Sequence, residues 1–208
     1  MSRVIEYYYA LASPWSYLGN DKLREIAKRH SLQIDPIIVD YDVMFERART
    51  VPLPKRPPLR KAYRLVELAR WGQFRKVPIN PQPKFYRGEV EEPNELEGAL
   101  MVTAAKLAGF DSLKLAHAIQ RALWAEERFP FTSEELCAIA DSEGFDGMSL
   151  LKATADPDTM SAYKEQTNQS VSRNVFGMPF YIIDDQPFWG QDRLELLECE
   201  LERNEKKQ

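Results

Sequence analysis

The first 43 residues alternate between an apolar strand, a helix and a second strand, and this alternation restricts the fold more than any other feature. The segment VIEYYYALA (4–12) is rich in β-branched and aromatic residues, as strands are. Pro14 then stands where a helix would begin, and apolar residues recur at helical spacing as far as His30. The segment SLQIDPIIVDYDV (31–43) predicts a second strand. A β-α-β unit predicts two parallel strands joined by a right-handed crossover.

Helical signals dominate the middle of the chain. Two proline-rich segments, VPLPKRPP (51–58) and VPINPQP (77–83), predict loops, because proline lacks an amide donor. Between them LRKAYRLVELARW (59–71) predicts a helix whose apolar side carries Ala62, Leu65, Val66 and Ala69. Further helices are expected to begin at Asn94, Ser112, Thr132 and Asp156 and to end near residues 107, 124, 144 and 170.

The strand pattern returns after residue 171. MPFYIID (178–184) predicts a strand, DDQ (184–186) a turn, PFW (187–189) a short strand and GQDRLELLECELE (190–202) a terminal helix. The predicted fold class is therefore α/β, with one small sheet interrupted by a large all-helical insertion. The expected domains are 1–43 plus 171–208 for the sheet and 44–170 for the insertion.

Composition excludes several classes of protein. A net charge of −4 argues against a nucleic-acid partner. No window approaches the ~18 consecutive apolar residues of a membrane span, and the N-terminus lacks a signal-peptide pattern, so we expect no membrane partner and a cytoplasmic location. The two cysteines and two histidines form no C-x-x-C motif and are too few for a metal cluster. No G-x-S-x-G motif is present, which disfavours a serine hydrolase.

Ser13 lies between the first strand and the first helix, and two roles are open to it. A serine directly before Pro14 is well suited to cap the helix, and the residues alone favour this structural role. The same position is also where ligands of open α/β sheets bind, and helix amides there favour an anion such as a thiolate. Trp15 could stack on a ligand or simply pack in the core.

Two segments near the C-terminus offer further binding groups. In NVFGMPFYIID (174–184), a cis Met178-Pro179 bond would leave the Met178 main chain free to pair with an extended peptide, but the sequence alone does not predict that isomer. In PFWGQDRL (187–194), helix amides could hold a carboxylate and Asp192 an ammonium group. Arg60 and Lys61 could add positive charge, or face water.

The blocks SPWSYLG, NVFGMPFYIID and FWGQDRLELLE, with PPLRKAYRLVELARW as a weaker fourth, resemble one family. They are similar to the 2-hydroxychromene-2-carboxylate isomerases and the related kappa-class glutathione transferases, in the DsbA branch of the thioredoxin superfamily. SPWS stands where that branch carries C-x-x-C, so a dithiol cycle is not expected. The resemblance implies a thioredoxin-like fold with the DsbA helical insertion, and a homodimer.

The resemblance also implies a cofactor, a mechanism and site residues. Glutathione would bind with its thiol beside Ser13 and add reversibly to an aromatic or unsaturated small-molecule substrate, which isomerises before glutathione is eliminated. The rest of the binding site would comprise Trp15, Lys61, Met178, Pro179, Trp189, Gln191, Asp192 and Arg193. The alternatives are a kappa-type transferase or peroxidase, a non-catalytic glutathione-binding protein and, least favoured, a hydrolase using Ser13.

Overall fold

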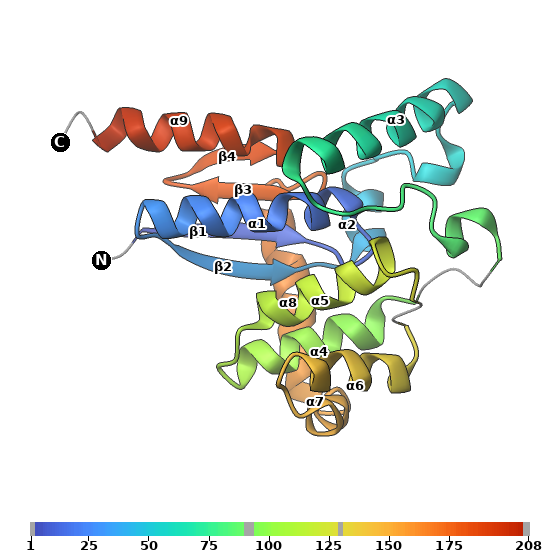
Figure 1. The fold of residues 1–208 in the computed structure, drawn as a ribbon. Helices are drawn as coiled ribbons and strands as arrows, with labels where there is room; N and C mark the ends of the chain where they lie inside the picture. The colour runs from blue at the N-terminus through green and yellow to red at the C-terminus, as the bar shows by residue number, and fades with distance from the viewer. Residues whose placement is uncertain (1–2, 90–93, 129–130, 206–208) are drawn as a thin grey trace.

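A four-stranded mixed sheet forms the centre of the molecule (Figure 1). The computed structural model describes residues 3–89, 94–128 and 131–205. The strands are β1 (Val4–Tyr9), β2 (Gln33–Ile38), β3 (Phe180–Ile183) and β4 (Gln186–Trp189), in the order β2-β1-β3-β4. β1 runs parallel to β2 and antiparallel to β3, and β3 pairs antiparallel with β4. Residues from the two ends of the chain therefore share one sheet, as the sequence predicts.

Helices, short 3₁₀ turns and the loops that join them make up the rest of the described chain. The helices are α1 (Pro14–Arg29), α2 (Tyr41–Arg47), α3 (Pro58–Arg75), α4 (Leu96–Leu107), α5 (Ser112–Trp124), α6 (Ser133–Ser142), α7 (Gly147–Ala153), α8 (Pro157–Ser172) and α9 (Leu194–Glu205). The 3₁₀ turns are η1 (Leu53–Lys55), η2 (Lys84–Arg87) and η3 (Gln191–Arg193). None of these helices is both long enough and apolar enough to cross a bilayer.

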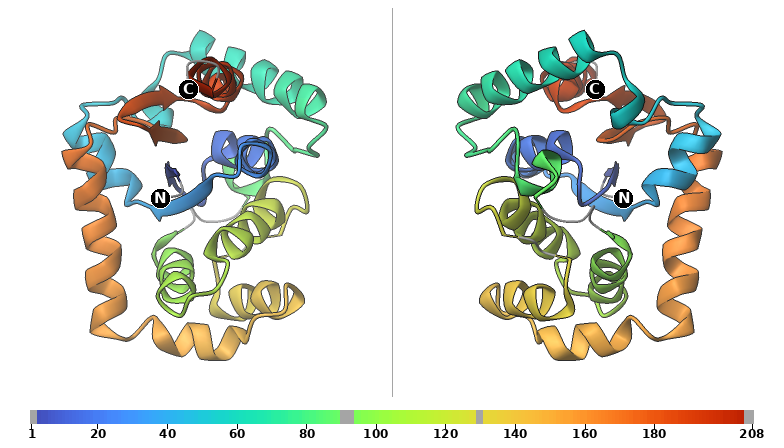
Figure 2. Two further views of the ribbon diagram at one scale, coloured as in Figure 1. Left: turned by 90° about the vertical axis from the view of Figure 1, so that its left-hand side faces the viewer. Right: turned by 90° about the vertical axis from the view of Figure 1, so that its right-hand side faces the viewer.

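The strand β1 separates two apolar layers, because its side chains alternate between the faces of the sheet. Tyr7 and Tyr9 lie in a cluster with residues of α1, α4, α5 and α9, whereas Tyr8 lies in a second cluster with α2 and the segment before β3. The ring of Tyr7 stacks on Tyr9 and on Tyr181 of β3, with centroids 4.9 and 5.2 Å apart. α8 runs along one side of the molecule, from the insertion back to the sheet (Figure 2).

Several predicted helix starts are observed with their caps. Ser13 caps α1, Thr132 caps α6 and Asp156 caps α8, each accepting a hydrogen bond from a main-chain amide of the first turn. The turn between β3 and β4 is made by Asp184 and Asp185, both with positive φ. The domain boundaries inferred from the sequence stay a prediction.

Three predictions for the segment after the first helix were wrong. The second strand ends at Ile38 instead of Val43, because the Asp40 carboxylate accepts bonds from the amides of Asp42 and Val43 and starts α2 there. The first proline-rich loop contains the turn η1. The expected apolar side of α3 faces outward, with Val66 46% exposed.

The orientation of α3 has a simple cause. Its fully buried residues are Leu68 and Gly72, and it packs against α1 over a short stretch. The periodicity of a sequence shows which residues share a helix face, but it does not show whether that face meets a partner. The helix α7 was not predicted. It begins only a few residues after α6 ends, where the Asp146 carboxylate accepts a hydrogen bond from the amide of Ser149 and caps the new helix.

Candidate active site

A pocket of about 540 Å³ lies between α3, the start of α1 and the turn after β4. Six of the nine residues predicted for the site line it: Trp15, Met178, Trp189, Gln191, Asp192 and Arg193. Ser13, Pro179 and Lys61 are not part of its lining. Lys61 instead donates from Nζ to the carbonyl oxygen of Pro54, 3.4 Å away, and its neighbour Arg60 reaches the pocket. Residues far apart in the sequence thus form one site.

Ser13 is buried at the N-cap of α1 and is 5% exposed. Its Oγ accepts a hydrogen bond from the amide of Ser16 at 3.3 Å. Its own hydroxyl proton is donated to no residue in the described part of the chain, and the Trp15 amide is unpaired there too. The capping role expected from the sequence is thus present, and it leaves one O–H and one N–H available at the positive end of the helix dipole.

Met178 lines the pocket with its main chain unpaired. The Met178-Pro179 peptide bond is cis. Neither the amide nor the carbonyl of Met178 has a hydrogen-bond partner among the described residues. The next residue, by contrast, is tied to the sheet, because the carbonyl of Pro179 accepts from the amide of Gly190 at 2.9 Å. One donor and one acceptor at a fixed spacing are what an extended peptide needs for main-chain pairing.

The turn after β4 is held by Arg75, a residue that no sequence motif indicates. Arg75, at the end of α3, donates from Nε to Gln191 Oε1 at 3.0 Å and from an Nη to the Gln191 carbonyl at 2.8 Å. It also forms an ion pair with Glu195 of α9. Gly190 is required here, because its φ is +103° and a Cβ would lie 2.4 Å from Asp192 Oδ1.

Aromatic residues and arginines form the opposite wall of the pocket. One face of α3 supplies Arg60, Tyr63, Arg64, Glu67 and Trp71, at helical spacing, and Arg56 comes from the loop before it. Glu67 is paired with Arg70, and Asp192 with Arg193. Arg56, Arg60 and Arg64 have no carboxylate partner in the described residues, so the wall carries surplus positive charge and favours an anion. Their spacing along α3 places them on one helix face, and this pattern could have indicated the pocket wall from the sequence.

Trp189 forms an exposed aromatic side of the pocket beside Gly177. Its ring meets Phe176 edge-on, with the centroids 4.9 Å apart, and it is 54% exposed. A Cβ at position 177 would lie 2.4 Å from Trp189 Nε1 and 2.9 Å from its Cε2. Gly177 is therefore needed so that the indole can lie flat against the main chain just before Met178.

We predict that Gly177→Ala displaces the Trp189 ring and lowers the free energy of unfolding by about 1–3 kcal/mol, the usual cost of overpacking. Urea unfolding and the tryptophan emission spectrum measure the two effects. In a Trp189→Ala background the same substitution should cost almost nothing, because the clashing ring is gone. An equal cost in both backgrounds would contradict this explanation.

Metal chemistry finds no support in the geometry. In residues 3–89, 94–128 and 131–205, no group of three or more His, Cys, Asp or Glu side chains could hold an ion. The two cysteines, Cys137 and Cys199, lie on α6 and α9, away from the pocket lining. The groups on offer are hydrogen-bond donors, positive charge and aromatic rings.

Comparison with known proteins gives a consistent result. The family model described as DSBA-like thioredoxin domain matches residues 4–202. The chain is 26% identical to 2-hydroxychromene-2-carboxylate isomerase of Sphingobium xenophagum, over 97% of this chain and 99% of that protein. It is 24% identical to glutathione S-transferase kappa 1 of Homo sapiens, over 95% and 90% of the two chains. A solved structure of a 2-hydroxychromene-2-carboxylate isomerase covers 98% of this chain and 97% of its own, with 24% identity and a TM-score of 0.81. The α/β fold class and the resemblance drawn from the sequence blocks are confirmed.

Proposed function

The chain belongs to the DSBA-like thioredoxin-domain family, and from that premise we propose that it is a glutathione-dependent isomerase of the 2-hydroxychromene-2-carboxylate type. Its relatives include both isomerases and glutathione transferases, which supports an enzyme. The observation that carries the proposal is the set of unpaired main-chain and hydroxyl groups beside one positively charged pocket. A cytoplasmic location and a homodimer remain predictions.

The groups around the pocket fit the chemical parts of glutathione. The unpaired amide and carbonyl of Met178 suit the cysteinyl residue, whose own main chain is extended. The turn of Gln191 and Asp192 suits the γ-glutamyl end, where Asp192 would hold the ammonium group. Arg60 suits a carboxylate in place of Lys61, whose Nζ is engaged by Pro54. Among the described residues the main chain of Met178 and the Arg60 side chain have no partner, and Asp192 pairs with Arg193, whose side chain is 49% exposed.

When bound, glutathione supplies a thiolate that adds reversibly to an unsaturated carbon. The Ser13 hydroxyl would donate a hydrogen bond to that sulfur, and the free Trp15 amide would add to the positive potential of the helix end. Arg56 and Arg64 would orient an anionic second substrate against Trp15 and Trp189. The protein thus lowers the thiol pKa and fixes the approach of the two reactants.

A glutathione titration tests the proposal. Tryptophan emission is a built-in signal, because Trp15, Trp71 and Trp189 line the pocket. We expect saturable binding at millimolar or tighter affinity and a bound thiol more acidic than free glutathione, measured by thiolate absorbance against pH. S-methylglutathione is the control, since it should bind without any ionisation. Absence of binding in fluorescence and calorimetry would remove glutathione from the proposal.

The second candidate is a kappa-type transferase or peroxidase, and the relative named glutathione S-transferase kappa 1 favours it. It uses the same thiolate and differs in what happens to the adduct. Conjugation of a chloronitrobenzene acceptor without isomerisation of 2-hydroxychromene-2-carboxylate would support the transferase. Tight glutathione binding with neither reaction would identify a binding protein.

A further inference from the structure

The turn that carries Ser13 is held by two side chains from the helical insertion. Gln120 of α5 donates from Nε2 to the carbonyl oxygen of Ala10 at 3.1 Å, and the amide of Ser13 donates to the same oxygen at 3.3 Å. Glu95, at the N-cap of α4, accepts a hydrogen bond from the amide of Ala12 at 2.9 Å. The main chain on the N-terminal side of Ser13 therefore depends on the insertion for its hydrogen bonds.

The burial of Gln120 makes this contact specific. The side chain is 0% exposed, and its Oε1 has no partner among the described residues. Burying an amide with half of its capacity unused costs free energy, so an apolar residue would be the better choice if packing were the only requirement. Neither Gln120 nor Glu95 lines the pocket, so neither is placed to touch a ligand there. What they share is the turn between β1 and α1.

We propose that Glu95 and Gln120 are positioning residues that fix the Ser13 turn from the insertion side and so set the direction of the Ser13 hydroxyl. The role of that hydroxyl rests on the proposed function, whereas the two contacts do not. On this view the helical insertion helps to position Ser13, in addition to packing against the sheet.

The ionisation of Glu95 gives this contact a pH dependence. Burial raises the pKa of Glu95 to about 7, against the lowering effect of the Ala12 and Leu11 amides. Asp42 and Asp40 raise it further. Burial also raises the pKa of the surrounding tyrosines Tyr41, Tyr86 and Tyr163, so these stay neutral near pH 7. Arg56 and Arg64 lie close to Tyr41 and Tyr86. Glu95 is thus protonated below about pH 7 and accepts a charge-assisted bond from Ala12 above it.

The first test follows the Ala12 amide by two-dimensional NMR between pH 5 and 9, without any ligand. In the wild type its shift should titrate with a midpoint near 7, and in Glu95→Gln this titration should vanish. Glu97→Gln is the matched control, because Glu97 lies two residues further along and its carboxylate accepts a hydrogen bond from the Ser133 hydroxyl instead. An Ala12 titration that persists in Glu95→Gln would overturn the assignment of Glu95.

The second test measures the bound thiol. Glu95→Ala and Gln120→Met should each reduce the thiolate fraction of bound glutathione about tenfold, the effect of one lost buried hydrogen bond. Methionine is close to glutamine in volume and lacks the donor, so it preserves packing. Glu95→Gln keeps an acceptor for Ala12 and should restore the wild-type thiolate fraction at pH 6. Glutathione affinity should change less than about twofold, since the groups of residues 178 and 190–193 are untouched.

The two tests separate the two proposals. If the wild type fails to bind glutathione, the proposed function fails, while the Ala12 titration and the hydrogen exchange of the Ser13 amide still decide the positioning roles. Faster exchange at Ser13 in Gln120→Met supports the role of Gln120. Unchanged exchange at Ser13 in that variant, or an unchanged bound thiol, overturns it.

Discussion

Ser13→Ala should raise the pKa of glutathione's bound thiol by about 1–2 units and lower turnover at neutral pH by about 10- to 100-fold. The reason is the hydroxyl proton, which no described residue accepts and which is free to stabilise a thiolate. A hydrogen bond to a charged group contributes about 1.5–3 kcal/mol, and each pKa unit corresponds to about 1.4 kcal/mol. Thiolate absorbance against pH measures the shift directly.

The same substitution also removes a helix cap, so a control has to separate the two roles of Ser13. Loss of the bond to the Ser16 amide should cost about 1 kcal/mol of stability. Ser13→Thr keeps both the cap and the hydroxyl and should retain most activity. Ser16→Ala should leave stability and the thiol pKa nearly unchanged, because the buried Ser16 Oγ has no partner among the described residues. An unshifted thiol pKa in Ser13→Ala would leave Ser13 as a cap alone.

Much of the fold could be predicted because its signals are local. Strand alternation, Ser13 before Pro14, and the Asp156-Pro157 pair each act within one turn of chain, and each element appears where it was expected. The helix α2 was not predicted, because its N-cap Asp40 comes two residues after β2 ends, inside a run of residues that the sequence pattern assigns to the strand. An aspartate at this position favours the start of a helix, whereas the β-branched residues around it favour a longer strand. The sequence alone does not show which of the two forms.

The site could be predicted only in part, because its support is long-range. Trp189 and Asp192 were predicted because they belong to the short segment PFWGQDRL. Arg75 lies 116 residues from its partner Gln191 and belongs to no recognisable motif. Gly19 is similar: a Cβ there would lie 2.8 Å from Tyr181 Oη and 2.9 Å from Gln191 Cβ, so the close approach of α1 to the turn requires glycine. Such a requirement becomes visible only when the two segments are placed side by side.

Arg75→Ala should have the largest effect on stability, about 2–3 kcal/mol, together with a loss of glutathione affinity of about tenfold. The Arg75 side chain is 6% exposed, and its guanidinium bonds to the side chain and carbonyl of Gln191 and to Glu195. It also lies over the ring of Trp71, 5.2 Å from its centroid. Its removal leaves Gln191 Oε1 without its donor in a largely buried position, and releases the turn that would bind the γ-glutamyl end. Urea unfolding and calorimetric titration measure the two losses.

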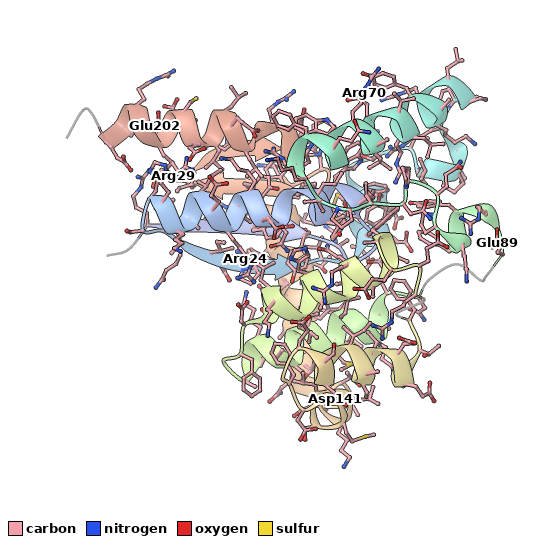
Figure 3. All side chains as sticks on the ribbon, viewed as in Figure 1. Arg24, Arg29, Arg70, Glu89, Asp141 and Glu202 are labelled. Carbon is pink, nitrogen blue, oxygen red and sulfur yellow. The ribbon has the colours of Figure 1, made fainter. Side chains whose placement is uncertain are left out.

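Arg70→Ala is the matched control, because it removes the same type of side chain from the same helix. Arg70 lies on the outer side of α3 (Figure 3), is 64% exposed and forms an ion pair with Glu67. Exposed pairs of this kind contribute little because water and salt screen them, so stability should barely change. Arg75→Lys should recover little, since an ammonium group cannot bond to Gln191 and Glu195 in the fixed geometry of a guanidinium. If Arg75→Ala cost no more than Arg70→Ala, the turn after β4 would be held by the sheet and by Gly190 alone, and the geometry of the site would not depend on α3.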